Sequence, residues 1–180
     1  MRQKGRPAIG VFGVGLAAYW PQFPGLKERL EAYQRQVEQW VGEHAAVVSG
    51  GLVDDAVRAR TIGEDFLRRG VDLVFCYVGT YATSSQVLPV LQGAKAPVVV
   101  LNLQPRAALD YVHTDTGEWL ANCSACCVPE ISCALSRAGI PFRQVSGMLA
   151  PEADVTEPYE KAREEIHRWC QAALVVRNLR

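Results

Sequence analysis

The sequence has no excess of charge of one sign. Its 19 basic and 19 acidic residues give a formal net charge of zero. Proteins that attract nucleic acids or anionic membranes carry a basic patch or stripe, whereas the basic residues here alternate with acidic ones on predicted helical faces. We therefore expect neither a nucleic acid nor a membrane as a partner.

The sequence also lacks long hydrophobic runs. None approaches the roughly 20 apolar residues that a transmembrane helix needs. The N-terminal segment MRQKGRPAIGVFGVG begins basic and turns apolar, as a signal peptide does, but its apolar part is short and glycine-rich, which favours a first β-strand. We therefore expect a cytoplasmic protein whose six cysteines are reduced thiols.

Motifs for several common activities are missing. There is no G-x-x-x-x-G-K-[ST] loop, no H-E-x-x-H motif, no Ser/His/Asp arrangement and no paired-carboxylate site. Gly13 and Gly15 match part of a dinucleotide fingerprint, but bulky Tyr19 and Trp20 follow in place of a third glycine, so we expect no nucleotide. The three histidines are scattered along the chain, at His44, His113 and His167. Only the second of them falls near the predicted ligand-binding edge.

What the sequence does contain is a regular alternation of strand-like and helix-like segments. Short apolar runs predict strands, and helical spacing of apolar residues predicts helices. The predicted strands are 8–14, 45–49, 71–78, 97–101 and 142–146, and the predicted helices are 25–43, 54–69, 84–93, 117–138 and 159–176. Asp54 is the predicted N-cap of the second helix, and Gly70 ends that helix. Pro89 kinks the third helix or lies in its first turn, and Pro129 interrupts the fourth.

This alternation predicts one α/β domain over residues 1–180. Right-handed crossovers give a three-layer αβα sandwich with five parallel strands in the flavodoxin-like order 2-1-3-4-5. Ligands of such sheets bind beyond the carboxyl ends of the strands. Five segments are predicted to meet at that edge: 13–25, 49–54, 79–85, 102–106 and 147–150.

The segments at that edge are rich in aromatic and uncharged polar side chains. Aromatic rings pack against the C–H faces of sugars, while hydroxyl and amide groups make directional hydrogen bonds with sugar hydroxyls. We therefore expect a neutral sugar or polyol as ligand, against the alternative that these are ordinary loop residues. The candidate substrate-binding residues are Tyr19, Trp20, Gln22, Thr80, Tyr81, Asn102 and Gln104.

Cysteines are concentrated in the segment NCSACC, residues 122–127. Thiolates with C-x-x-C spacing can bind zinc or an iron–sulfur cluster, and the same spacing occurs in redox motifs. A second C-x-x-C and a nearby histidine are missing, and cysteines also pack in cores as small apolar residues. Cys123, Cys126 and Cys127 therefore have three interpretations: a metal site, a redox site or simple packing.

At these loops the chain resembles the N-terminal domain of the L-arabinose/L-fucose isomerase family. The family's loop ending in Leu-Tyr-Gly is similar to the region ending at Tyr19, and its run His-Thr-Phe-Ser-Pro-Ala is similar to residues 79–84. Its run Asn-Gln-Thr-Ala-His-Gly-Gly-Arg-Glu-Phe is similar to residues 122–131, and its Gly-His-Trp is replaced by Gly-Met-Leu at 147–149. The shared residues are Tyr19, Thr80, Asn122, Ala125, Glu130 and Gly147. The histidines and the arginine of the family motifs are replaced, so the resemblance is to a divergent member.

The resemblance implies aldose–ketose isomerisation by proton transfer through an enediol, with a divalent metal, usually manganese, polarising the sugar oxygens. In the family, Glu and His residues of later domains hold that metal. The resemblance therefore implies that this chain is the N-terminal domain of a larger protein and holds no catalytic residue, metal ligand or cofactor. It also implies a homo-oligomer in which Tyr19, Gln22 and Tyr81 are substrate-side contacts.

Three hypotheses about function follow. The main one is the N-terminal domain of a sugar isomerase-like protein, inactive alone, which contributes substrate-side and subunit contacts. The first alternative is a non-catalytic sugar- or polyol-binding module with the same fold. The second is a redox or metal protein that uses the cysteines of residues 122–127.

Overall fold

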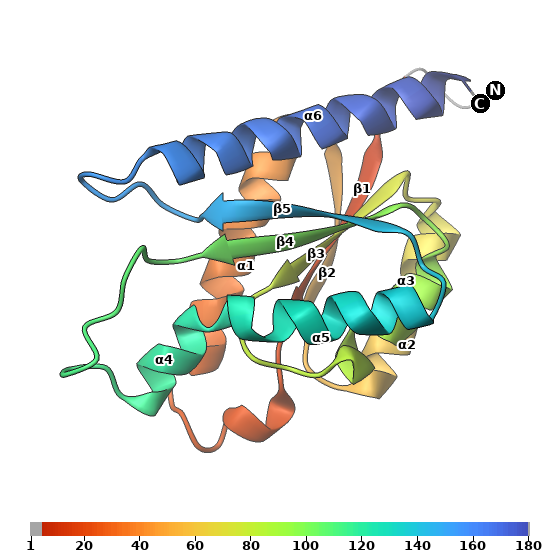
Figure 1. The fold of residues 1–180 in the computed structure, drawn as a ribbon. Coiled ribbons are helices and arrows are strands. Elements are labelled where there is room, and N and C mark those ends of the chain that lie inside the picture. The colour runs from red at the N-terminus through yellow and green to blue at the C-terminus, as the bar shows by residue number, and fades with distance from the viewer. Residues whose placement is uncertain (1–4, 180) are drawn as a thin grey trace.

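A parallel β-sheet of five strands forms the centre of the computed structural model (Figure 1). The structure describes residues 5–179; residues 1–4, the basic start of the segment weighed above as a signal peptide, lie outside it. The strands are β1 (Ala8–Val14), β2 (Ala46–Val53), β3 (Leu73–Val78), β4 (Val98–Gln104) and β5 (Phe142–Met148). Their order, β2-β1-β3-β4-β5, confirms the predicted flavodoxin-like topology.

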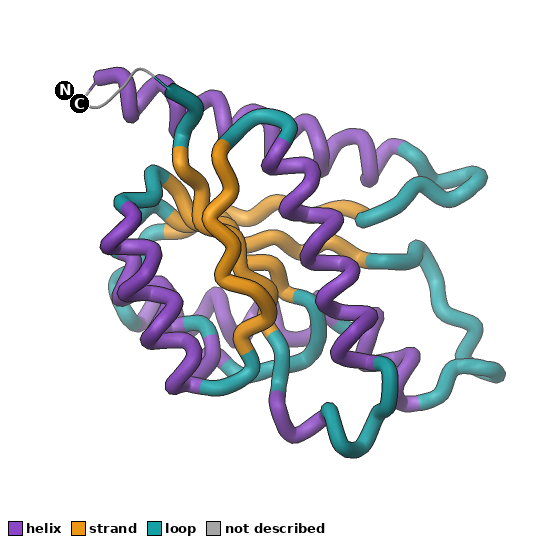
Figure 2. The backbone as a smooth tube through the Cα atoms, turned by 180° about the vertical axis from the view of Figure 1, so that it is seen from behind, coloured by secondary structure: helices purple, strands orange, loops and turns teal. Residues whose placement is uncertain are grey.

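Helices cover both faces of this sheet, which gives three layers (Figures 1 and 2). One face packs against α1 (Leu26–Gly42) and α6 (Glu157–Leu179), and the other against α2 (Ala56–Arg69), α3 (Leu88–Ala94) and α5 (Ser124–Arg137). All six side chains of β3 are buried between the layers, as its continuously apolar sequence predicts. A further short helix, α4 (Thr116–Asn122), packs beyond the carboxyl ends of the strands in a third apolar cluster with α1.

Three strands continue beyond their predicted ends. β2 extends to Val53, β4 to Gln104 and β5 to Met148. The pairing of β4 with β5 continues in register to the last residues, so the polar ends of these strands keep their backbone hydrogen bonds. Much of what was predicted as loop at 49–54, 102–106 and 147–150 is therefore strand, and Asn102 lies on the sheet itself.

Two predictions about helix ends are wrong. The helix predicted at 117–138 is two helices that meet at Cys123, and Pro129 lies inside α5 without ending it. Asp55, and not Asp54, caps α2, because its carboxylate accepts hydrogen bonds from the N–H groups of Val57 at 2.7 Å and Arg58 at 2.8 Å.

Other helix signals agree with the structure. Gly70 ends α2 in the left-handed conformation that glycine adopts without strain. Pro89 lies in the first turn of α3, where its missing N–H costs nothing. None of the helices within residues 5–179 combines the length and the apolar composition needed to cross a bilayer.

A stacked pair of histidines joins the end of α1 to α6 and makes stability depend on pH. The rings of His44 and His167 lie 3.9 Å apart at an interplanar angle of 12°. Burial lowers the pKa of His44, and the positive charge of His167, Arg163 and Arg6 lowers it further, while Glu43 acts in the opposite direction. The unfolded chain thus binds a proton at this position more readily than the folded chain does.

Acidification from pH 7.5 to 5.5 is therefore expected to destabilise the protein through His44. The loss begins as the pH falls through the ordinary histidine pKa of about 6.5, and it levels off below the lowered pKa of the folded state. Urea unfolding at several pH values should show this slope, and His44→Gln should make it shallower. An unchanged slope in the variant would contradict the assignment to His44.

Candidate functional site

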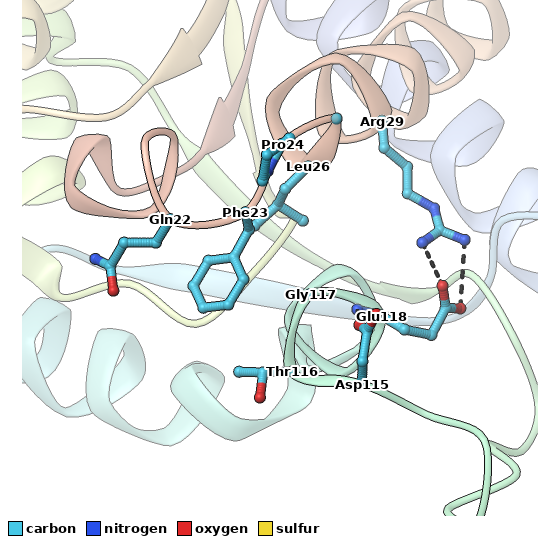
Figure 3. Close-up of a pocket in the computed structure, with 10 residues that line it drawn as sticks. Gln22, Phe23, Pro24, Leu26, Arg29, Asp115, Thr116, Gly117 and Glu118 are labelled. Carbon is cyan, nitrogen blue, oxygen red and sulfur yellow. Dashed lines mark hydrogen bonds and ion pairs between the residues drawn. The ribbon is translucent and has the colours of Figure 1, made fainter.

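An open groove lies at the carboxyl edge of the sheet, between the β1–α1 segment and the start of α4 (Figure 3). Its volume is about 560 Å³, within the usual range for small-molecule sites. Its lining residues are Gln22, Phe23, Pro24, Gly25, Leu26, Arg29, Asp115, Thr116, Gly117 and Glu118. The groove therefore lies where parallel α/β sheets bind ligands.

The β1–α1 segment forms the first wall of the groove. A single turn of 3₁₀ helix, Ala17–Tyr19, turns the chain, and the N–H groups of Gln22 and Phe23 then donate to the Tyr19 carbonyl. The Phe23 ring packs edge-on against the Tyr19 ring and points into the groove towards α4, where it lies beside Gly117 (Figure 3). Gln22 is exposed, and its amide donates to the Ala18 carbonyl at 2.6 Å.

An ion pair between α1 and α4 closes one end of the groove. The Arg29 guanidinium donates to both carboxylate oxygens of Glu118, at 2.5 and 3.3 Å (Figure 3). These hydrogen bonds hold the pKa of Glu118 below its usual range, and Arg106, 3.7 Å away, acts in the same direction. The two side chains remain 34% and 26% exposed, so the pair is worth only about 1 kcal/mol or less.

Trp20 stabilises the position of the β1–α1 segment. Its indole N–H donates to the Asp54 carboxylate at 2.7 Å, which ties the β1–α1 segment to the end of β2. Its ring packs so closely on Gly15 that a Cβ there would lie 3.1 Å from it. Trp20 was predicted as a substrate contact, and the structure places it outside the groove lining.

Thr80 and Tyr81 lie in the turn after β3, behind the groove. Thr80 is fully buried, and its hydroxyl donates to the Leu120 carbonyl of α4 at 2.7 Å. Tyr81 is 45% exposed. Burial raises the pKa of the nearby Tyr19 hydroxyl, and the proximity of Cys123 and Tyr81 raises it further. The structure thus leaves Tyr81 exposed in this turn, while Thr80 holds α4 in place.

Asn102 and Gln104 lie at the end of β4. The Asn102 amide donates to the Ser146 hydroxyl at 3.4 Å, across to β5. The Gln104 side-chain amide is oriented so that its nitrogen donates to the Asn122 carbonyl at 2.9 Å. In this orientation its oxygen accepts hydrogen bonds from the Ser124 hydroxyl at 2.7 Å and from the Ala125 N–H at 3.1 Å. Gln104 therefore supports the break between α4 and α5 and does not line the groove.

The cysteines of residues 122–127 do not form a metal centre in the described chain. Within residues 5–179, no three His, Cys, Asp or Glu side chains come together as metal ligands. Cys123 and Cys127 are buried, and this burial raises the pKa of each thiol to about 11, while Cys126 is exposed. Both buried thiols are thus protonated at neutral pH, which is unfavourable for redox chemistry. The packing interpretation fits the structure best.

Sequence reasoning missed two of the three charged residues that line the groove, Arg29 and Glu118; the third is Asp115. Glu118 follows the N-cap Asp115 by three residues, and the Asp115 carboxylate accepts from the Glu118 N–H at 2.7 Å. That D-x-x-E spacing resembles a capping box and could have placed Glu118 in the first turn of a helix. Nothing local predicts its pairing with Arg29, which lies 89 positions away.

A scan against protein-family models and a search of curated proteins found no match to this chain. The resemblance to the L-arabinose/L-fucose isomerase family therefore stays a prediction, and the groove carries the functional argument.

Proposed function

We propose that this chain is the sugar-facing N-terminal domain of an aldose–ketose isomerase-like protein. The groove at the carboxyl edge carries the proposal, because it combines an aromatic ring, an amide and an ion pair. The Phe23 ring can pack against the C–H face of a sugar. The Gln22 amide and the Arg29–Glu118 pair can donate to and accept from neighbouring hydroxyls. Arg29 and Glu118 neutralise each other, and the third charged residue of the lining, Asp115, uses its carboxylate to cap α4, which favours an uncharged ligand.

In this proposal the chain binds and orients the sugar. The manganese ion that the family resemblance implies would supply Lewis-acid chemistry from further domains, since residues 5–179 offer no cluster of three metal ligands. This chain takes no part in the metal-assisted proton transfer. Tyr81 and Trp119 are large and partly exposed near the groove, and they would face a neighbouring subunit of a homo-oligomer. The six free cysteines support a cytoplasmic location.

The proposal predicts that the chain binds sugars without converting them. A panel of pentoses and hexoses, followed by NMR titration, should shift backbone signals of the β1–α1 segment and of α4. No ketose should form from any aldose, even with Mn²⁺ added, because residues 5–179 contain no cluster of three metal-ligating side chains. Ketose formation by this chain alone, or the absence of binding to every sugar, would overturn the proposal.

Gln22→Ala is the matched test of the groove. Loss of one uncharged hydrogen bond should weaken sugar binding about fivefold. Gln92→Ala is the control, because Gln92 is exposed in a separate groove that includes Trp169 and none of the residues of this one. If both variants bind sugars equally well, the sugar lies elsewhere on the molecule.

A further inference from the structure

A second groove lies at the opposite edge of the sheet, where β4 and β5 begin (Figure 1). Its volume is about 630 Å³. Val98 pairs with Phe142 there, and both residues line the groove. The end of α3, the turn between α5 and β5 and the middle of α6 supply the other lining residues. None of them also lines the first groove, so the two are separate sites.

The lining of the second groove is mainly apolar. Its large apolar side chains are Leu91, Pro97, Ile140, Pro141, Phe142 and Trp169. Leu91 belongs to the core on one face of the sheet, and Trp169 packs against the core on the other face. The groove therefore runs around the edge of the sheet from one helical layer to the other. Its volume and its apolar lining suit a small molecule with an apolar body.

Both charged residues that line the second groove are cations. They are Lys95, which follows α3, and Arg143 of β5. Both side chains are exposed, and neither forms an ion pair with a carboxylate within residues 5–179. The Arg143 guanidinium donates to the Phe142 carbonyl at 3.2 Å, which leaves most of its N–H groups available. The groove thus combines an apolar lining with two positive charges that can attract an anion.

The backbone of Lys95 has an unfavourable conformation. Its φ of 51° lies in the left-handed region, and within residues 5–179 every other residue with a positive φ is a glycine. Gly70 and Gly139 have this conformation at the ends of α2 and α5. A lysine in this position costs stability relative to glycine. Since residues held in unfavourable backbone conformations are concentrated at functional sites, this observation supports a function for Lys95 in the groove.

We propose that the second groove binds a small amphipathic anion, whose apolar body packs against the apolar lining and whose carboxylate or sulfonate interacts with Lys95 and Arg143. Burial of the apolar body supplies most of the affinity. The two cations favour an anion over a neutral compound, because they make charge-assisted hydrogen bonds with it. This inference does not rest on the proposed function, since the sugar is placed in the other groove.

Two fluorescent dyes with the same apolar body test the proposal. Anilinonaphthalenesulfonate carries a sulfonate, and phenylnaphthylamine is the same molecule without it. In fluorescence titrations the protein should bind one molecule of either dye. Lys95→Gly and Arg143→Gln should each weaken binding of the sulfonate dye about threefold, and together about tenfold, and should leave binding of the neutral dye unchanged. Unchanged affinity of the double variant for the sulfonate dye would overturn the proposal.

Lys95→Gly also separates binding from stability. In urea unfolding this variant should be as stable as the wild type or more stable, because glycine adopts the left-handed conformation without strain. If it is less stable, Arg143→Gln alone decides. Arg60→Gln is the matched control, because Arg60 is exposed on α2 and does not line the groove. An equal loss of dye affinity in this control would show an effect of net charge and would overturn the site.

The indole N–H signals of the tryptophans locate the dye by NMR. The sulfonate dye should shift the signal of Trp169, assigned with Trp169→Phe, and leave that of Trp20 in place, because Trp20 lies at the opposite edge of the sheet. A shift of Trp119 on α4 without one of Trp169 would place the dye near the first groove and contradict the proposal. A second copy of the chain is the competing occupant. A dimer in sedimentation that binds no dye, and that Pro141→Glu separates into monomers, would make this groove a subunit interface and would also overturn the proposal.

Discussion

Arg177→Met is expected to lower the free energy of unfolding by about 3 kcal/mol. Arg177 of α6 donates to the Asp72 carboxylate at 2.7 Å, just before β3. The same carboxylate oxygen accepts from the Ala8 N–H at 2.9 Å at the start of β1. The Asp72 side chain is only 3% exposed, so removal of the guanidinium leaves a buried charge with a single backbone donor. The cost comes from that unpaired charge more than from the lost attraction.

Urea unfolding of a double-mutant cycle measures this effect. Asp72→Asn keeps an oxygen for the Ala8 N–H and removes the charge, so the double variant should recover much of the stability that Arg177→Met loses. Arg168→Met is the control, because its pair with Glu164 is exposed on α6 and should be worth about 0.5 kcal/mol or less. Equal losses in Arg177→Met and Arg168→Met would show that the Asp72 carboxylate is not buried as described.

The order of the sheet was predictable because it depends on signals that are local or general. Continuous apolar runs mark buried parallel strands, as in β3, and right-handed crossovers leave few topologies. Strand ends were less predictable. Asn102 and Gln104 are polar, yet they stay in β4 because β5 continues to pair with them. Pairing of this kind depends on a partner strand some 40 residues away and leaves no local pattern.

The buried face of α2 shows a second limit of sequence patterns. Val57 and Leu67 are large apolar residues of this helix, yet they are 73% and 48% exposed. The helix instead buries Ala59, Gly63 and Phe66. Small residues carry little hydrophobic signal, although they allow another backbone to come close.

The position of the candidate site was more predictable than its residues. The carboxyl edge follows from the fold, and Gln22 does line the groove there. Polar and aromatic residues were expected to face a ligand, but Trp20 and Thr80 make hydrogen bonds within the protein instead. A composition argument cannot distinguish these two uses, because both require the same donors and acceptors.

Gly63→Ala is expected to destabilise the protein by about 2 kcal/mol, although alanine is the better helix former. A glycine inside a helix normally costs about 1 kcal/mol relative to alanine, so the exchange should by itself be favourable. At this position, however, a Cβ would lie 2.7 Å from the Val90 carbonyl oxygen and 2.8 Å from that of Pro89. These are backbone atoms of α3, which cannot turn aside as a flexible side chain could. The two helices must separate, and the packing that they lose outweighs the gain in helix propensity.

Gly42→Ala measures the effect of helix propensity on stability alone, for comparison with Gly63→Ala. Gly42 is the last residue of α1, and the nearest atom to a Cβ there is a Val47 methyl group at 3.9 Å, an ordinary contact. This variant should be as stable as the wild type or more stable by up to about 1 kcal/mol. In thermal unfolding, Gly63→Ala should lower the Tm by about 4–8 °C, while Gly42→Ala should leave it unchanged or raise it. A Gly63→Ala protein as stable as Gly42→Ala would mean that α2 and α3 can move apart without loss, and that their close contact contributes nothing to the stability of the fold.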